Sequence, residues 1–455
     1  MPVKTYDVVV VGGGAAGLVA AVAAGAFGAR TALVEIDRLG GECSWTGCVP
    51  SKALIAAASL AHRSGHIPGN VMEHVLDTVQ KASKSSKARN LLKRYQVDLL
   101  FGPSAFKNRN TLELPDTTIT AGKFILCTGS SALRPDIPGL RDGYLTNREV
   151  WDLPAPPASL LVIGGGPIGT ELAQAFHRLG TKVTLIHSRD RLLPRDDAEL
   201  AGELTGLLAE DGLDIRLNSR VREVEKTETG WRVNAGSDNL FGEHLLVSLG
   251  RTANAEGLNL EAAGVEFSRE QIKTDKYLRT TAPNIWAAGD CTGGLRFSHI
   301  AEIEAKTAVR NALFPFNSRP DYQGAPWATF TDPELAHLGL TEEECKEQNL
   351  KYSVYYQPFA GDDRAIADET TDGRVKILSS PLGKLLGVHI LGPRAGELIN
   401  EFVLARRKGL RLHDIGLTAH VYPTLGLAGQ RAADEWFAGW AAHPWAKQLF
   451  RMFRR

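Results

Sequence analysis

Two cysteines and a lysine lie close together in the segment GGECSWTGCVPSKAL, residues 40–54. Cys43 and Cys48 are five positions apart, and Lys52 follows the second thiol after four residues. A helix that begins near Cys43 would lower the pKa of a thiol through its dipole and free amides, and a nearby ammonium group adds positive potential. Such thiols exchange readily, whereas most cysteines simply pack as small apolar side chains. The segment therefore indicates redox chemistry, with two buried structural cysteines as the alternative.

The remaining cysteines, Cys127, Cys291 and Cys345, form no second pair. A Cys-x4-Cys spacing is wider than that of the usual zinc sites, so we expect no metal site. Five cysteines in 455 residues are also too few for an extracellular disulfide framework. We therefore expect a reducing, cytoplasmic environment.

The elements that must position these thiols begin with a dinucleotide-binding fingerprint at the N-terminus. Residues 8–11 form an apolar run suited to a buried parallel strand, and residues 15–27 form a small-residue helix. Between them lies G-x-G-x-x-G, made of Gly12, Gly14 and Gly17. This arrangement gives a tight turn, close approach of a pyrophosphate and close packing of the helix. A second strand ends in Glu35, which is placed to accept hydrogen bonds from a ribose diol.

The pattern returns in the middle of the chain, which predicts a second dinucleotide site. A strand reaches residue 163, a helix spans about 168–179, and another strand spans 183–186. The glycines of this fingerprint are Gly164, Gly166 and Gly169. The second strand ends in His187 instead of a carboxylate, and Arg189, Arg191 and Arg195 follow. Arginines can pair with a 2′-phosphate, which favours NADPH over NADH, with a solvated basic loop as the alternative.

Several motifs together resemble the FAD-dependent pyridine nucleotide-disulfide oxidoreductases of class I, which include glutathione reductase, lipoamide dehydrogenase and mercuric reductase. They are the two fingerprints, GGECSWTGCVPSK, CTGSSALRPDIPG, GRTAN and IWAAGDCTGG, in that family's order along nearly the whole chain. GCVPSKAL, SHIAEIEAKTAVRNALFP and TFTDPELAHLGLTEEE are most similar to the mercuric-reductase-like branch.

The resemblance implies roles for individual residues. Cys48 corresponds to the thiol next to the flavin, which forms a charge-transfer thiolate, and Cys43 corresponds to the outer thiol that attacks the substrate. Lys52 and Glu171 match an ion pair beside the flavin N5. Glu35 and Asp290 match ligands of the FAD adenosine ribose and ribityl chain, and the motifs add Gly129 and Arg251 to the cofactor-binding residues. The implied path runs from NADPH to FAD, then to a Cys43–Cys48 disulfide, and then to an outside acceptor.

The chain also departs from the family near its C-terminus. Disulfide-reducing members carry a His before the Pro of an HPT motif and a Glu five residues after that His, but this chain has Tyr422 and Leu427 there. His420 shares a face with Tyr422 if the segment is extended, so both are candidate catalytic residues, with a polar interface role for His420 as the alternative. The cysteine pair at the C-terminus of mercuric reductase is missing, which argues against efficient mercury handling. Pro167 stands where many relatives place a Tyr that gates the nicotinamide pocket.

These observations predict an α/β protein with two Rossmann-like domains and a C-terminal α+β dimerisation domain. We expect FAD binding in 1–148 and 268–318, NAD(P)H binding in 149–267, and dimerisation in 319–455. Lys+Arg and Asp+Glu both number 52, so the balanced charge argues against nucleic acid as a partner. Apolar runs are too short to span a membrane, and the basic, partly amphipathic end HPWAKQLFRMFRR is interpreted as a solvated helix, so no membrane partner is expected.

Three functions remain open. The first is a homodimeric NAD(P)H-dependent reductase whose thiols act on a small disulfide, a metal ion or another thiol-reactive acceptor. The second is a diaphorase or transhydrogenase-like flavoenzyme that does not use the thiols, and the third is a dithiol flavoprotein sensor or complex subunit. Retention of both cysteines favours the first.

Overall fold

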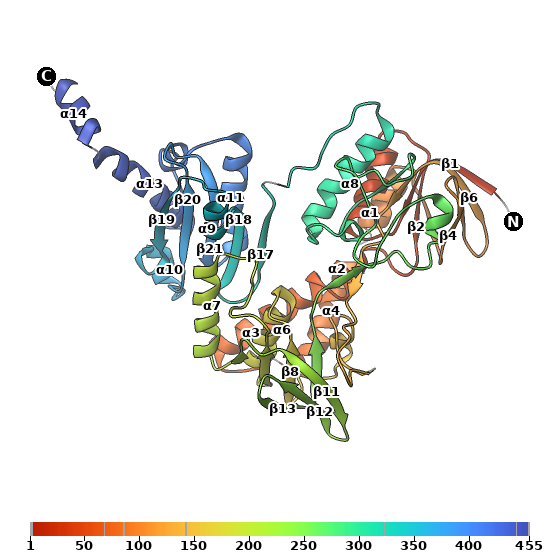
Figure 1. Ribbon diagram of the computed structural model, residues 1–455, viewed down its shortest axis with the longest axis horizontal. Coiled ribbons are helices and arrows are strands. Elements are labelled where there is room, and N and C mark those ends of the chain that lie inside the picture. The colour runs from red at the N-terminus through yellow and green to blue at the C-terminus, as the bar shows by residue number, and fades with distance from the viewer. Residues whose placement is uncertain are drawn as a thin grey trace.

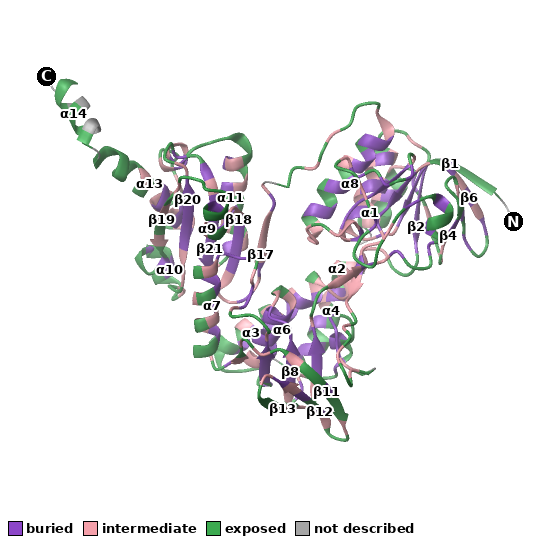
Figure 2. Ribbon diagram, in the orientation of Figure 1, coloured by how far each residue is buried: buried purple, intermediate pink, exposed green. Residues whose placement is uncertain are grey.

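A computed structural model describes residues 3–67, 69–84, 87–141, 143–322, 324–442 and 444–453, and Figure 1 shows them folded into three lobes. Each lobe has its own sheet, whose central strands are buried in Figure 2. Two lobes have a sheet whose central strands are parallel, with helices, and the third has an antiparallel sheet with helices. The predicted fold class is confirmed. The boundaries of the four segments stay predictions.

The first lobe is built on a sheet whose central strands are parallel. Its order is β3 (Asp98–Phe101), β2 (Thr31–Glu35), β1 (Val3–Val11), β6 (Thr118–Leu126), β5 (Thr111–Glu113) and β4 (Ala105–Asn108), and β16 (Ile285–Ala287) also pairs with β6. Helices α1 (Ala15–Ala26) and α8 (Ser298–Leu313) pack together over one face. β1 begins before the apolar run because residues 3–6 pair with β6, where the side chains are mostly exposed and give no apolar signal.

The register of this sheet gathers the site residues at one edge. Val11 lies opposite Val34 of β2 and Leu126 of β6, and Leu126 lies opposite Ala287 of β16. The carboxyl ends of these parallel strands therefore meet. In open α/β sheets ligands bind outside the carboxyl ends of the strands. The residues that follow each strand are brought to one place by this alignment.

The second lobe repeats the strand, turn and helix of the first. Its parallel sheet has the order β10 (Asp214–Arg216), β9 (Lys182–Ile186), β8 (Ser159–Ile163) and β14 (His244–Val247). Helix α6 (Pro167–Arg178) follows β8, and α7 (Ala198–Glu210) follows β9. A three-stranded antiparallel sheet, β11 (Val221–Thr227), β12 (Gly230–Ala235) and β13 (Asp238–Gly242), completes the lobe. The predicted helix and strand near 168–186 are confirmed within one residue.

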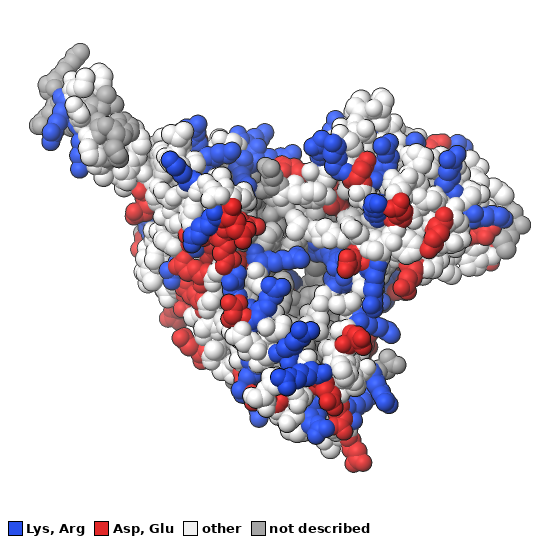
Figure 3. Space-filling model, in the orientation of Figure 1, with Lys and Arg blue, Asp and Glu red and all other residues white. Residues whose placement is uncertain are grey.

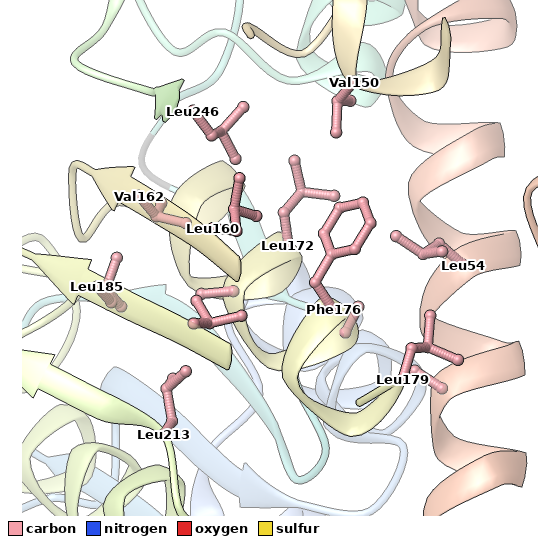
Figure 4. Close-up of a cluster of buried hydrophobic side chains, with 14 of the residues drawn as sticks. Leu54, Val150, Leu160, Val162, Leu172, Phe176, Leu179, Leu185, Leu213 and Leu246 are labelled. Atoms are coloured by element: carbon pink, nitrogen blue, oxygen red, sulfur yellow. The ribbon is translucent and has the colours of Figure 1, made fainter. Parts of the chain in front are cut away.

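Helix α3 (Cys48–Ser64) joins the first two lobes. It belongs to the segment expected to bind FAD, but its buried face packs into the core of the second lobe together with α4 (Val71–Lys84). Figure 4 shows Leu54 of α3 opposite Phe176 of α6, and both side chains are fully buried. This packing places the N-terminal end of α3, which carries Cys48, between the two dinucleotide-binding units.

The C-terminal lobe is an antiparallel sheet with the order β17 (Pro326–Thr329), β18 (Glu334–Gly339), β21 (Leu385–Gly392), β20 (Arg374–Ser379) and β19 (Ser353–Pro358). The helices α11 (Ala395–Lys408) and α13 (Leu427–Ala442) cover it, with the shorter α9 (Glu342–Glu347), α10 (Asp363–Ala367) and α12 (Leu412–Gly416) around it. α14 (Pro444–Phe453) follows α13.

A buried ammonium group connects this lobe to the second one. Lys376 of β20 is fully buried, and its Nζ donates to Asp197 at 2.9 Å, Glu199 at 2.8 Å and Glu342 at 2.9 Å. Figure 3 shows acidic residues gathered over this junction of α7 and the C-terminal lobe. A buried charge is tolerated only when it is paired and hydrogen-bonded, so these three carboxylates hold β20 and α7 in a fixed relation.

Candidate active site

A cavity of about 1120 Å³ opens at the carboxyl ends of the strands of the first lobe. It is lined by the first fingerprint, the end of β2, the Cys43 segment, residues 127–132 and the Asp290 loop. Its volume lies slightly above the usual range of about 300–1,000 Å³ for small-molecule and cofactor sites. The cavity brings together six residues expected to bind cofactor, which are Gly12, Gly14, Glu35, Gly129, Arg251 and Asp290.

The glycines of the first fingerprint form a cradle that side chains would fill. Gly12 has φ +103°, and a Cβ there would lie 2.3 Å from the carbonyl oxygen of Cys127. A Cβ on Gly17 would lie 1.7 Å from the carbonyl oxygen of Gly12, so α1 packs directly on the turn. At Gly14 the nearest atom would be 3.9 Å away, which leaves the helix N-terminus open to a ligand. This geometry fits the pyrophosphate of FAD.

Two carboxylates line the cavity, and each is held by hydrogen bonds. Glu35 is buried and accepts hydrogen bonds from the amides of Gly13 at 2.5 Å and Asp37 at 2.8 Å. Asp290 accepts from the hydroxyl of Ser130 at 2.7 Å, and that hydroxyl in turn accepts from Arg251 Nε at 2.6 Å. Both carboxylates are held in place and lie in the cavity wall, and their roles toward the ribose and ribityl groups stay predictions.

The thiols lie where three helices converge. Cys43 is in the short helix α2 (Gly41–Trp45), and Cys48 is the first residue of α3. Ser298, the first residue of α8, donates a hydrogen bond from its Oγ to Cys43 Sγ at 3.2 Å, and the same Oγ lies 4.0 Å from Cys48 Sγ. Both cysteines are free thiols in the structure. Sequence reasoning missed Ser298, because it is 250 residues from Cys48 and no local pattern marks it.

The two sulfur atoms have very different acidities. The pKa of Cys43 is lowered to about 6, first by the hydrogen bond from Cys48 and also by Ser298 and Lys52. The pKa of Cys48 is raised, because its proton is held by the Cys43 sulfur and the group is desolvated. One thiolate shared in this way is a strong nucleophile at neutral pH. The distribution suits Cys43 as the attacking thiol. It leaves the proton on Cys48, whereas the charge-transfer role expected of Cys48 beside the flavin requires a thiolate there, so that role stays a prediction.

The expected ion pair is formed and ties three lobes together. Lys52 Nζ donates to Glu171 Oε2 at 2.8 Å, and the carboxylate is buried in α6. The other carboxylate oxygen, Oε1, accepts from the amide of Phe330 at 2.9 Å, next to β17 of the C-terminal lobe. The ammonium also lies 4.4 Å from the centre of the Phe330 ring. Lys52 is thus fixed one helical turn after Cys48.

The second fingerprint has the same geometry as the first. Gly164 has φ +117°, a Cβ on Gly169 would lie 1.9 Å from the Gly164 carbonyl oxygen, and Gly166 is open. His187 Nδ1 accepts from the amide of Gly165 at 3.1 Å, as Glu35 does from the amide of Gly13. A neutral imidazole therefore occupies the place of the first site's carboxylate, since burial and Arg189 lower the pKa of His187.

The three arginines after His187 are not equivalent. Arg191 Nη2 donates to Glu343 Oε2 at 2.8 Å, so this guanidinium group forms an ion pair between the second and C-terminal lobes. Arg189 and Arg195 are exposed and form no ion pair within the part of the chain that the structure describes. Arg189 and Arg195 are therefore the cations of this loop that are available to a ligand.

His420 and Tyr422 lie in the C-terminal lobe and do not line the cavity of their own chain. The His420 ring nitrogens lie 2.8 Å from the Thr418 carbonyl oxygen and 2.8 Å from Glu401 Oε1. Both nitrogens are therefore engaged. Tyr422 is exposed, and its hydroxyl donates to Asp363 at 3.1 Å.

Among the described residues no cluster of three or more His, Cys, Asp or Glu could hold a metal ion, and no helix could cross a membrane.

Comparisons with known proteins agree with this architecture. The family model "Pyridine nucleotide-disulphide oxidoreductase" matches residues 6–305, and that family's dimerisation domain matches residues 325–433. A mercuric reductase of Bacillus cereus is 35% identical over 92% of this chain and 70% of the relative. A dihydrolipoyl dehydrogenase of Thermus scotoductus is 35% identical over 95% of this chain and 97% of the relative.

Among solved structures, the Cu(II) complex of the HOCl-induced flavoprotein disulfide reductase RclA from Escherichia coli is similar, with a TM-score of 0.87 and 29% identity over 95% of this chain and 99% of that one. The two fingerprints, the thiol pair, the ion pair beside it and the C-terminal sheet all occur in one chain. The chain belongs to the pyridine nucleotide-disulphide oxidoreductase family and is a flavin-dependent oxidoreductase.

Proposed function

We propose that the enzyme is a homodimeric, NADPH-dependent flavoprotein that reduces a thiol-binding metal ion through Cys43 and Cys48, with Cu(II) as the first acceptor to test. Bound FAD would take two electrons from NADPH and pass them to the Cys43–Cys48 disulfide. The observation that supports this proposal most is the thiol pair. Ser298 donates a hydrogen bond to Cys43, and Lys52, one helical turn after Cys48, is paired with Glu171.

The two thiols have distinct protonation states during the proposed reaction. Opening of the disulfide leaves one proton between the two sulfurs, and the low pKa of Cys43 favours a thiolate there at neutral pH. The thiol and the thiolate then reduce two Cu(II) to two Cu(I), release that one proton and reform the disulfide. NADPH restores the thiol and thiolate without a further proton, so each cycle consumes one NADPH and two Cu(II) and releases one proton.

A metal acceptor is favoured over a disulfide because of proton transfer. Reduction of a disulfide must deliver a proton to the leaving thiolate, and general acid catalysis contributes about 10²–10⁴-fold. The family positions for that acid and its partner hold Tyr422 and Leu427, and His420, which pairs with Glu401, does not line the cavity of its own chain. A metal ion needs soft ligands and no acid, and Cys43 and Cys48 supply two thiol ligands. The similar RclA structure contains Cu(II), and several relatives are mercuric reductases.

The choice of NADPH is part of the proposal. It is supported by His187 in place of a carboxylate and by the unpaired Arg189 and Arg195 in the loop after it. A carboxylate at this position would repel a 2′-phosphate, whereas a guanidinium group can bind it through two parallel hydrogen bonds. The reduced thiols and the NADPH donor fit the cytoplasm, where we place the enzyme.

Anaerobic turnover tests the proposal. NADPH oxidation is followed with Cu(II), and Cu(I) is measured with a chromogenic chelator, in parallel with oxidised glutathione as the acceptor. We expect Cu(II) reduction at two Cu(I) per NADPH, at a rate at least about 10²-fold above glutathione reduction, since only the latter needs the missing acid. Cys43→Ser and Cys48→Ser should each abolish Cu(II) reduction while FAD remains bound. Undiminished turnover in both variants would instead favour direct hydride transfer from the flavin.

A further inference from the structure

The final segment of the chain, residues 437–455, differs in composition from the rest of the protein. We refer to this segment, FAGWAAHPWAKQLFRMFRR, as the tail. It has four Lys or Arg residues and no Asp or Glu, although the whole chain is balanced at 52 of each sign. It also contains five aromatic residues. Cationic and aromatic residues are thus concentrated in a segment that the catalytic geometry does not use.

The described part of the tail is helical and lies outside the packed core. The core of the C-terminal lobe includes Ala433 of α13 as its last buried residue, and the dimerisation family model also ends at residue 433. Figures 1 and 2 show the end of α13 and α14 projecting from the C-terminal lobe with exposed surfaces. Phe437 and Trp440 stack on each other and remain 50% and 41% exposed, and Met452 and Phe453 are 74% and 76% exposed.

Exposed aromatic side chains beside cations are typical of helices that lie in a membrane interface. Such helices bury their apolar face about 5–10 Å into the boundary between headgroups and acyl chains, and their Lys and Arg residues face anionic headgroups. In α14 the sequence spaces Lys447 and Arg451 four residues apart, which a helix places on one side. Met452 and Phe453 supply apolar surface within the same helix. No described helix could cross a bilayer, so the tail would lie on the membrane.

We propose that the tail, whose end the sequence alone led us to interpret as a solvated helix, instead binds the surface of an anionic phospholipid bilayer and holds the reductase at that membrane. A basic tail could instead pair with an acidic surface of a second copy, but the acidic residues at the junction of α7 and the C-terminal lobe are already engaged. Glu199 and Glu342 accept from Lys376, and Glu343 accepts from Arg191. Anionic lipid headgroups have the charge that complements a tail with four Lys or Arg residues and no Asp or Glu.

Vesicle flotation with the full-length, FAD-loaded enzyme tests this proposal. Vesicles of phosphatidylcholine with phosphatidylglycerol are compared with pure phosphatidylcholine at low and high salt. We expect binding to the anionic vesicles that falls as salt rises, because exposed charges are screened. The double variant Lys447→Glu/Arg451→Glu should bind at least about 30-fold more weakly, since each cation near an anionic surface contributes about fivefold. A matched control, Lys182→Glu/Arg222→Glu, reverses two exposed cations of the second lobe and should bind like the unmodified enzyme.

The experiment separates the alternatives. Removal of residues 443–455 should abolish vesicle binding while FAD content, dimer mass and NADPH-dependent turnover in solution stay unchanged. The proposal fails if the intact enzyme does not bind anionic vesicles at low salt, or if the shortened enzyme binds equally well. The proposal also fails if the shortened enzyme becomes monomeric and the intact enzyme does not bind the vesicles, because the tail would then be a contact between two copies.

Discussion

Replacing Ser298 by Ala would remove the only neutral donor outside the thiol pair that the described structure places on Cys43 Sγ. The Ser298 hydroxyl donates to this sulfur at 3.2 Å from the first turn of α8, and it stabilises the thiolate form. Cys48 and Lys52 would remain as the other groups that lower the pKa of Cys43. The variant should therefore keep a reactive Cys43 that requires a higher pH for ionisation.

The size of the shift follows from the value of one hydrogen bond. A hydrogen bond to a charged group contributes about 1.5–3 kcal/mol, and the lower end applies here because Cys43 is partly exposed and keeps a second donor. One pKa unit corresponds to about 1.4 kcal/mol, so we expect the pKa of Cys43 to rise by about one unit. From a starting value of about 6, the thiolate fraction at pH 6 should fall about fivefold.

The assay is the rate of alkylation by iodoacetamide as a function of pH, measured anaerobically on the NADPH-reduced enzyme with mass spectrometry to identify Cys43. Because Cys43 is an acid with a lowered pKa, its reactivity should appear as pH rises through about 6. In Ser298→Ala the midpoint should move to about 7. Ser298→Thr keeps a hydroxyl and should retain most of the original midpoint. An unchanged midpoint in Ser298→Ala would show that the hydroxyl does not stabilise the thiolate.

Three further predictions follow from the contacts around the site. Arg189→Ala should raise the KM for NADPH about tenfold and leave that for NADH nearly unchanged, because one charge-assisted pair with the 2′-phosphate is lost. In the matched Arg191→Ala variant the KM for NADPH should hardly change, since this side chain is engaged with Glu343, and similar effects of both substitutions would contradict the assignment. Glu171→Gln should slow thiol formation in stopped-flow reduction by NADPH, because the Lys52 ammonium loses its paired charge, and an unaltered rate would argue against a role beside the flavin. Lys376→Met should lower the free energy of unfolding by about 3–5 kcal/mol in denaturant titrations, because Asp197 would be left buried without its partner; a loss below about 1 kcal/mol would refute this.

The sequence predicted those parts of the site whose signals are local. Both glycine fingerprints, the strand that ends in Glu35 and the strand just before His187 follow from short patterns, and the structure has each element in place. The Lys52–Glu171 pair joins residues 119 apart, so it required the family resemblance and not spacing. The fold of the C-terminal lobe followed from the resemblance in the same way.

Other features depend on tertiary packing and have no sequence signal. Ser298 approaches Cys43 only because α8 packs beside α1 at the edge of the first sheet. The packing of α3 against α6 could not be read from its apolar positions, which fit either lobe. Arg191 looked equivalent to Arg189 in the sequence, and only the position of α9 shows that Glu343 engages it. The roles of His420 and Tyr422 stay predictions, because any cavity they complete would belong to a partner subunit.

The central claim, that Cys43 and Cys48 are the outlet for electrons from NADPH, is tested most directly by an anaerobic NADPH titration of the FAD-loaded enzyme with thiol counting. Two electrons per FAD should produce two new titratable thiols and a long-wavelength charge-transfer band, and NADH should do so less efficiently. Direct conversion to reduced flavin without new thiols would contradict the claim, because the electrons would then leave the flavin without passing through the cysteine pair.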